Sequence, residues 1–542
     1  MRPLSPLLAA CFFVLACSAQ PGPIVDSPAG KIEGRVDGDL RVFKGIPFAL
    51  PPVGQARWKP PSPMPRWDGV RKAMEFGPAC NQPTAKVQSV YMRDPLPMSE
   101  DCLTLNIWSS AGAHDAPVFF WIYGGALTTG GSRESLYDGA RLAAQGVVVV
   151  SINYRLGVLG WLALPELSAE SPEGVSGNYG LLDQIEALRW VRRNIGAFGG
   201  NPSNVTIAGE SAGALSVMYL MASPPARGLF AKAIAESAYM ISTPELKERR
   251  YGSDAAEASG TRLAAALHKP NLAALRAMDA QALAEAAPAA GFGPWGAVDG
   301  KILPRQLVDV FGRGEQAPVP ILAGFNSGEI RSLRVLAPRP PAKSAEYERI
   351  IRERYLDLAD EFLKLYPSTN MEESILATTR DALYGWTAER LVRKQAELRE
   401  PSYLYYFDHG YPAADSAGLH AFHASELPYV FGMLDATTPS WPKIPATPRE
   451  TNLSDAMIGY WTSFARAGKP RAASQPDWPA YGLAQSYMAF TDAPHPSEHL
   501  LPGMYEFNEA VVSRAKAIGN IPWNWYVGLA SPKLPASKTA DK

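Results

Sequence analysis

The sequence predicts an α/β fold with a mostly parallel central sheet, and three segments support this prediction. Residues 117–123 and 146–153 are continuous apolar runs, which are typical of strands buried on both faces of a parallel sheet. Residues 181–195 repeat apolar side chains at helical spacing, and two glycines at 199–200 end the pattern. Strands that alternate with helices in this way indicate βαβ units.

A glycine-rich turn follows the next predicted strand. Residues 204–208 are short, apolar and β-branched, and residues 214–222 are good helix formers. Between them lies the pentapeptide Gly209-Glu210-Ser211-Ala212-Gly213. A G-x-S-x-G motif between a strand and a helix is the nucleophile elbow of the α/β-hydrolase fold. The pattern predicts that Ser211 is a nucleophile at a helix N-terminus, where backbone N–H groups favour negative charge.

The remaining chain is predicted to form one domain over residues 30–528. Residues 242–290 and 344–398 are rich in Ala, Glu and Arg, which predicts helical insertions that cap the site. We see no linker that would separate independent domains. Residues 531–542 are mostly Lys, Ser, Pro and Ala, so this tail is predicted to be disordered.

Composition and charge exclude several classes of function. The formal net charge is −1, which gives no electrostatic reason to bind nucleic acid or an anionic membrane surface. The chain carries no dinucleotide-binding or P-loop fingerprint. We expect no metal and no organic cofactor.

The N-terminus predicts export. Residues 7–16 are an apolar run behind Arg2, as in a signal peptide that ends near residue 19. Two cleavage patterns compete: a bacterial lipobox that makes Cys17 the lipidated first residue, and an ordinary small-residue site at residues 17–19. We favour the first. The mature protein is then periplasmic, anchored to the outer membrane by lipid, or secreted, and only this anchor would contact a membrane.

Cysteine usage agrees with export. Cys11 and Cys17 belong to the signal region, which leaves only Cys80 and Cys102. An exported chain with one remaining pair of cysteines is a candidate for one disulfide.

A nucleophilic serine needs a base, and the base needs an acid that orients it. Among the histidines after Ser211, spacing leaves three candidate bases, His409, His420 and His423. Glu329 follows the strand-like run 319–324, where this fold places its acid, and Asp299 is comparably placed. The residues alone leave these choices open.

The oxyanion of an acyl-transfer intermediate needs backbone N–H donors. Gly124 and Gly125 directly follow the predicted strand 117–123, and a loop without side chains lets the substrate oxygen approach the backbone. Ala212, which follows the nucleophile, is predicted to supply the third donor.

Several ordered motifs resemble the type B carboxylesterases, the cholinesterase-related group of α/β-hydrolases. The resemblance runs from about residue 30 to 506 and includes segments 43–54, 100–108, 153–157 and 199–213. It implies Ser211 as nucleophile, Glu329 as acid and His423 as base, since residues 423–432 fit the histidine segment of the family. It also implies that Gly124, Gly125 and Ala212 form the oxyanion hole. The pair Cys80 and Cys102 matches the first disulfide of the family.

Two departures from the family pattern are visible. Tyr123 stands where the family usually has His. The resemblance therefore does not say which side chains support the loop at Gly124 and Gly125 from behind. The loop 81–101 has Tyr91 and no tryptophan, so cation–π binding of choline is poorly supported.

Three further residues are candidates for the substrate pocket. Phe292 and Trp295 resemble the acyl-pocket segment of the family in position, and core packing is the alternative for both. Glu210 stands beside the nucleophile and either tunes the potential of the site or accepts a structural hydrogen bond.

The expected activity is that of an exported serine carboxylesterase acting on a small-molecule ester through an acyl-enzyme. One alternative is an amidase or peptidase with the same triad, and another is a non-catalytic binding module of this fold. The sequence leaves the substrate and the oligomeric state open.

Overall fold

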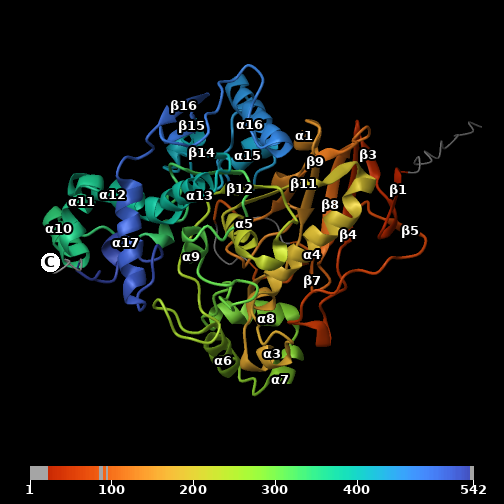
Figure 1. Ribbon diagram of the computed structural model, residues 1–542, viewed down its shortest axis with the longest axis horizontal. Helices are drawn as coiled ribbons and strands as arrows, with labels where there is room; N and C mark the ends of the chain where they lie inside the picture. Colours follow the sequence, from red (N-terminus) through yellow and green to blue (C-terminus); the bar gives the residue numbers. More distant parts are fainter. Residues whose placement is uncertain (1–21, 85–88, 93–95, 537–542) are drawn as a thin grey trace, which may run out of the picture.

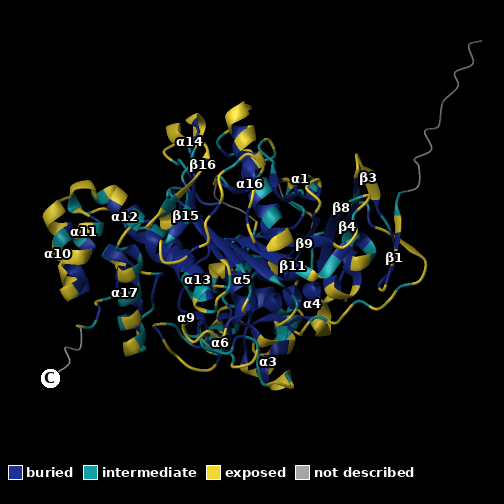
Figure 2. Ribbon diagram, turned by 45° about the horizontal axis from the view of Figure 1, so that its top comes forward, coloured by how far each residue is buried: buried dark blue, intermediate teal, exposed yellow. Residues whose placement is uncertain are grey.

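The computed structural model describes residues 22–84, 89–92 and 96–536. Its centre is an 11-stranded sheet with the order β16-β15-β14-β13-β12-β11-β9-β10-β8-β4-β3. Figure 2 shows this buried sheet between α16 (Pro448–Ala467) and α1 (Ala140–Ala143) on one side and α4 (Tyr179–Asn194) and α5 (Ala212–Ala222) on the other. The predicted α/β class is therefore confirmed.

The seven strands from β10 to β15 run parallel, and antiparallel strands flank them at both edges. The parallel strands, in sheet order, are β10 (Val148–Ile152), β9 (Ala116–Ile122), β11 (Gly200–Glu210), β12 (Lys232–Glu236), β13 (Ile321–Asn326), β14 (Ser402–Phe407) and β15 (Ser486–Phe490). The edge strands are β8 (Thr104–Ser110), β4 (Leu40–Pro47), β3 (Arg35–Asp37) and β16 (Pro494–Glu498).

The segments that predicted the fold lie at its centre. The apolar runs 117–123 and 146–153 correspond to β9 and β10, and every residue of both strands is buried. The amphipathic segment forms α4 (Tyr179–Asn194), which a 3₁₀ turn extends to Phe198. Gly199 ends it at φ 88°, a left-handed conformation that favours glycine.

Both predicted cap segments are largely helical. The first contains α6 (Ala256–Ala266), α7 (Leu272–Arg276) and α8 (Ala280–Ala289). The second contains α10 (Ser344–Tyr355), α11 (Ala359–Leu365), α12 (Met371–Arg380), a π-helical turn (Asp381–Gly385) and α13 (Trp386–Glu397). Helices α10, α11, α12 and α17 (Met504–Ile518) form a lobe at one end of the molecule (Figure 1).

The predicted disorder of the C-terminal tail is wrong for residues 531–536. Leu534 is only 3% exposed and packs in the core of the α10–α12 lobe. Its N–H donates to the carbonyl of Arg354 at 2.8 Å. One apolar side chain in that core is enough to hold an otherwise polar segment. Residues 537–542 lie outside the described part of the chain.

The N-terminal prediction falls on residues that the structure does not describe, Cys17 included. Across residues 22–84, 89–92 and 96–536, no helix has both the length and the apolar composition that crossing a membrane requires.

The predicted disulfide is present. Cys80, at the end of β6 (Ala79–Cys80), is bonded to Cys102, and both residues are buried. The bridge closes the loop that carries Gln82, whose side chain accepts from Gly130 N–H at 2.8 Å.

Replacing both cysteines with alanine is expected to lower the free energy of unfolding by about 3 kcal/mol, because the bridge restricts the unfolded chain. Denaturant unfolding of the double variant and the oxidised wild type measures the difference. The reduced wild type is the control, and it should match the variant. Equal stability of all three proteins would contradict this role of the bridge.

Candidate active site

Ser211 occupies a sharp turn between β11 and α5 (Ala212–Ala222). Its backbone has φ 56° and ψ −120°, a conformation that non-glycine residues rarely adopt and that clusters at functional sites. The turn depends on glycines. A Cβ on Gly213 would lie 2.0 Å from the Ile122 carbonyl oxygen, and one on Gly209 would lie 2.5 Å from the backbone of Gly213. The elbow predicted from the sequence is thus formed by close contact between β9, β11 and α5.

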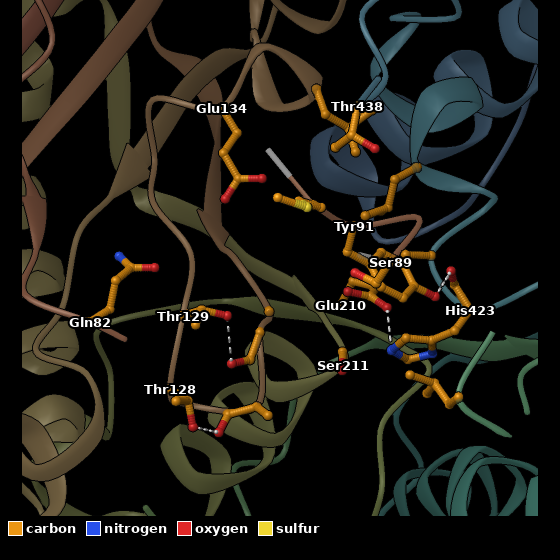
Figure 3. Close-up of a pocket in the computed structure, with 18 of the residues that line it drawn as sticks. Gln82, Ser89, Tyr91, Thr128, Thr129, Glu134, Glu210, Ser211, His423 and Thr438 are labelled. Atoms are coloured by element: carbon orange, nitrogen blue, oxygen red, sulfur yellow. Dashed lines mark hydrogen bonds and ion pairs between the residues drawn. The ribbon is translucent and has the colours of Figure 1, made fainter. Parts of the chain in front are cut away.

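A cavity of about 550 Å³ lies over this turn. Its wall includes Ser211, Glu210 and His423. In Figure 3, Gln82, Thr128, Thr129 and Glu134 lie on the side of Ser211 away from His423. Most other side chains in the wall are apolar, among them Leu96, Met98, Leu136, Leu333, Leu336, Leu383, Leu427 and Trp441. The cavity has the size and lining of a site for a small organic molecule.

The imidazole of His423 is held by Glu329. Nδ1 of His423 lies 2.5 Å from Oε2 of Glu329, and both side chains are buried. The other carboxylate oxygen, Oε1, accepts from the hydroxyl of Ser237 at 2.6 Å and from the N–H of Asn326 at 2.8 Å. Glu329 stands just after β13, and the carboxyl end of that strand places it here. This bond fixes the orientation of the ring and leaves Nε2 toward the cavity.

Nε2 of His423 lies 3.0 Å from Oε1 of Glu210, an ion pair drawn in Figure 3. Oε1 of Glu210 is buried and has no hydrogen-bond partner among the described residues, so this contact is an ion pair without a hydrogen bond. No hydrogen bond joins the Ser211 hydroxyl to His423 within the described residues. Such bonds often form only when substrate is bound. Ser211, Glu210 and Glu329 therefore surround one imidazole.

Charge controls the protonation of this imidazole. Burial would lower the pKa of His423, but the negative charges of Glu210 and Glu329 outweigh it and raise this pKa to about 9. Burial raises the pKa of Glu210 to about 7, although the charge of His423 opposes the shift. The histidine and Glu210 thus titrate as a coupled pair.

Two further carboxyl groups are buried behind the site. Burial raises the pKa of Glu236 to about 8 and that of Glu426 well above its usual range. Trp461 Nε1 donates to Glu236, and Asn326 Nδ2 donates to Glu426. The charges that raise the pKa of His423 are those of Glu210 and Glu329.

The other candidate bases lie outside the cavity wall. His409 is buried, and its Nε2 lies 2.7 Å from Oε2 of Glu450, a pair that joins the end of β14 to α16. His420 lies between Asp415 at 2.6 Å and Asp408 at 3.1 Å, and its side chain is 41% exposed. Both histidines thus make structural contacts with carboxyl groups away from the cavity.

The alternative acid, Asp299, also has a structural environment. Its Oδ1 accepts from the N–H groups of Lys301 and Ile302, each at 2.8 Å, and of Leu303 at 3.0 Å. These bonds close a turn. Asp299 is not part of the described cavity wall.

The loop after β9 brings its backbone to the cavity. Gly124, Gly125 and Ala126 line the wall, and Gly125 and Ala126 have φ values of 101° and 55°. A Cβ on Gly124 would lie 2.8 Å from the Glu210 carbonyl oxygen, so the loop touches the elbow directly. In the described part of the chain no protein acceptor takes the N–H of Gly125, Ala126 or Ala212. Ala126 is a candidate donor that the sequence analysis did not name.

Tyr123 packs behind this loop. Its ring stacks on Tyr154 at a centroid distance of 4.7 Å, and the Tyr154 hydroxyl donates to the Tyr123 carbonyl at 2.9 Å. A Cβ on Gly130 would lie 2.5 Å from the Tyr123 ring. Tyr123 thus supports the loop at residues 124–130 by packing behind it.

Two tyrosines contact His423 without having been predicted to do so. The Tyr91 hydroxyl donates to the His423 carbonyl at 2.8 Å and lies 2.6 Å from the Ser332 hydroxyl. The ring of Tyr384 lies 5.3 Å from the imidazole. The only sequence signal for Tyr91 was its position in the loop between the two cysteines.

Of the three residues predicted for the substrate pocket, two lie in the cavity wall and one does not. Trp295 and Glu210 line the cavity. Phe292 is not in the described cavity wall and follows the alternative of core packing: its N–H donates to the Ala287 carbonyl at 3.0 Å, and its ring packs on the separate α6–α8 hydrophobic cluster. Among the described residues, none from 242–290 lines the cavity, whereas Leu383 and Tyr384 of the second cap segment do.

A family model described as the carboxylesterase family matches residues 21–507. The chain belongs to the carboxylesterase family. It is 36% identical over 500 residues to the fumonisin B1 esterase of Sphingopyxis macrogoltabida, covering 88% of each chain. It is 37% identical to the para-nitrobenzyl esterase of Bacillus subtilis (84% of this chain, 92% of the relative) and 33% identical to the human cocaine esterase (86% and 87%). The chain is therefore a carboxylic ester hydrolase.

Solved structures agree with this assignment. A structure of PNB esterase superposes with a TM-score of 0.77 at 33% identity and covers 89% of this chain and 99% of its own. The Geobacillus stearothermophilus carboxylesterase EST55 at pH 6.8 gives a TM-score of 0.74 at 33% identity, with the same coverage. The chain therefore has the α/β-hydrolase fold of these esterases.

Proposed function

We propose that the carboxylesterase works through a Ser211-His423-Glu329 triad and an acyl-enzyme intermediate. The observation that carries the proposal is the bond between His423 and Glu329 in the same cavity as the strained elbow serine. His423 takes the proton of the Ser211 hydroxyl while the Ser211 oxygen attacks the ester carbonyl. Glu329 orients the imidazole and stabilises the imidazolium that forms.

Backbone N–H groups hold the oxyanion of the tetrahedral intermediate. The predicted set is Gly124, Gly125 and Ala212, and Ala126 joins it as a candidate. Each such donor contributes about 3 to 4 kcal/mol in other hydrolases. The dipole of α5 adds to this field at its N-terminus. His423 then protonates the leaving alcohol, and water attacks the acyl-enzyme with His423 again as base.

The substrate we propose is a small ester with at least one apolar group. The cavity volume of about 550 Å³ suits a small organic molecule, and apolar side chains dominate its wall. The relatives include a fumonisin B1 esterase, a para-nitrobenzyl esterase and a cocaine esterase.

A matched pair of substrates tests the reaction class. We expect p-nitrophenyl butyrate to be hydrolysed far faster than the p-nitroanilide of the same acid, because the amide has the poorer leaving group. Initial rates at equal concentration measure the ratio. Faster anilide cleavage would assign the triad to amide hydrolysis.

Replacing Glu210 with glutamine is expected to move the acid limb of the kcat/KM–pH profile to lower pH by about one unit or more. The general base must be neutral, and the charge of Glu210 raises the pKa of His423. Without that charge, the imidazole loses its proton at lower pH, so activity persists there.

The control for this experiment is Glu134→Gln, which changes a carboxyl group of the same cavity on the far side of Ser211 (Figure 3). Its profile should match the wild type. A Glu210→Gln profile that is unchanged, or that moves to higher pH, would contradict the electrostatic role of Glu210.

We also propose that the protein is exported. The observations in support are the signal-like residues 1–19 and the disulfide between Cys80 and Cys102, since structural disulfides persist in oxidising compartments. Mass analysis of the mature N-terminus tests the route. A lipid-modified Cys17 supports the lipobox, and an uncleaved Met1 would overturn the proposal of a cleaved signal.

A further inference from the structure

The chain continues past the family match, which ends at residue 507. After α17, residues 519–536 return to the body of the protein, and we call this segment the C-terminal strap. Its start is fixed on the loop at Tyr251, whose N–H donates to the Gly519 carbonyl at 2.8 Å. Pro522 packs so closely on Gly252 that a Cβ there would lie 2.6 Å from its ring.

The middle of the strap is buried and hydrogen-bonded. Trp523 is 1% exposed, and its ring contacts that of Tyr251 edge to face at 4.8 Å. Asn524 has φ 63°, a left-handed conformation that Asn tolerates. Its side-chain amide donates to the Met240 carbonyl at 3.1 Å. Met240 is next to Tyr239, which lines the cavity, so this bond holds the strap beside the cavity wall.

The far end of the strap is fixed on α10. The N–H of Gly528 donates to the Tyr355 hydroxyl at 2.7 Å. The N–H of Leu534 donates to the Arg354 carbonyl, and Leu534 is buried. The strap is therefore fixed at its start, at Gly519, and at its far end, from Gly528 to Leu534, so the residues between Gly519 and Gly528 have a defined position.

Trp525 lies between the anchors and faces the cavity. Its ring meets that of Trp295 edge to face, with centroids 5.4 Å apart and an interplanar angle of 79°. Both rings line the cavity and remain partly exposed to it. The next residue, Tyr526, is 54% exposed and is not part of the wall.

Two tryptophan rings in this arrangement present a rigid apolar surface. Aromatic side chains bury a large area and favour edge-to-face or offset contact with another ring. The strap supplies the second ring, which a chain ending at residue 507 could not provide.

We propose that the C-terminal strap completes the substrate cavity, and that Trp525, held against Trp295, is a specificity-determining residue that binds an aromatic or bulky apolar group of the ester. The inference rests on the proposed function and names the class of substrate that the site prefers.

The test compares esters that differ in one group. In the acyl series, p-nitrophenyl benzoate is compared with p-nitrophenyl acetate, and in the alcohol series benzyl acetate is compared with ethyl acetate. In Trp525→Ala, the ratio of kcat/KM for the aromatic to the small ester should fall about tenfold in one series, mainly through KM. Trp525→Phe should lie between this variant and the wild type.

Tyr526→Ala is the matched control, since it removes the neighbouring ring outside the wall, and it should leave both ratios unchanged. Trp295→Ala should lower the same ratio as Trp525→Ala, and the two changes together should cost less than the product of their separate effects. If Trp525→Ala does not fold, Trp525→Phe and Trp525→Leu carry the comparison.

Unchanged ratios in both series would overturn the proposal, and so would an equal fall in Tyr526→Ala. Hydrolysis of the small esters by the wild type is scored separately, because its absence would contradict the proposed function rather than the role of the strap.

Discussion

Replacing Ser211 with alanine is expected to reduce kcat by roughly five to six orders of magnitude, as loss of the nucleophile does in other triad hydrolases. The residue sits at φ 56° on the elbow and lines the cavity, and the proposed mechanism has no other group to form the acyl-enzyme. Steady-state hydrolysis of p-nitrophenyl butyrate measures the loss.

Two controls separate a chemical from a structural effect. The thermal unfolding midpoint of Ser211→Ala should stay near that of the wild type, because only a hydroxyl is lost and this hydroxyl makes no hydrogen bond within the described residues. Substrate binding should persist, since the cavity wall is otherwise unchanged. Activity within tenfold of the wild type would show that another group attacks the ester.

Replacing His423 with alanine is expected to lower kcat by a similar five to six orders of magnitude, and Glu329→Gln by about four. The smaller value for Glu329 follows from its role. It orients the imidazole through the 2.5 Å bond to Nδ1 but does not touch the substrate. The same ester assay measures both variants.

His420→Ala is the matched control for His423→Ala. His420 stands three residues earlier and pairs with Asp408 and Asp415 outside the cavity, so we expect its loss to change kcat less than twofold. A large loss in His420→Ala with little loss in His423→Ala would reassign the base.

Local patterns predicted the fold and the elbow well. Buried parallel strands such as β9 and β10 need continuous apolar runs, and a strand-turn-helix elbow needs glycines where backbones touch. Both requirements concern residues that are close together in the sequence. The glycines at 209 and 213 show this, since a Cβ on either would collide with the backbone.

Choices that depend on distant contacts could not be made from spacing. His409, His420 and His423 all follow strand-like or turn segments, and only the family resemblance favoured His423. Its partner Glu329 is brought to it by a backbone bridge between the neighbouring residues Gly328 and Phe422. Nothing local in the sequence shows that His409 instead meets Glu450 on α16.

The pocket was the least predictable part for the same reason. Phe292 and Trp295 are three residues apart, yet Phe292 packs on the α6–α8 cluster while Trp295 lines the cavity. Trp525 reaches the wall only because the C-terminal strap returns to it. The polar composition of residues 531–542 predicted disorder, but a single buried side chain, Leu534, holds the end of the strap in place.

The most direct test of the triad mechanism is covalent labelling with diisopropyl fluorophosphate, followed by mass spectrometry of the digested protein. We expect one diisopropylphosphoryl group per chain, on the peptide that contains Ser211, with parallel loss of esterase activity. Labelling should be much slower in His423→Ala, because the base that activates the hydroxyl is missing. An adduct on a different residue with full loss of activity, or full activity after Ser211 is labelled, would contradict the account.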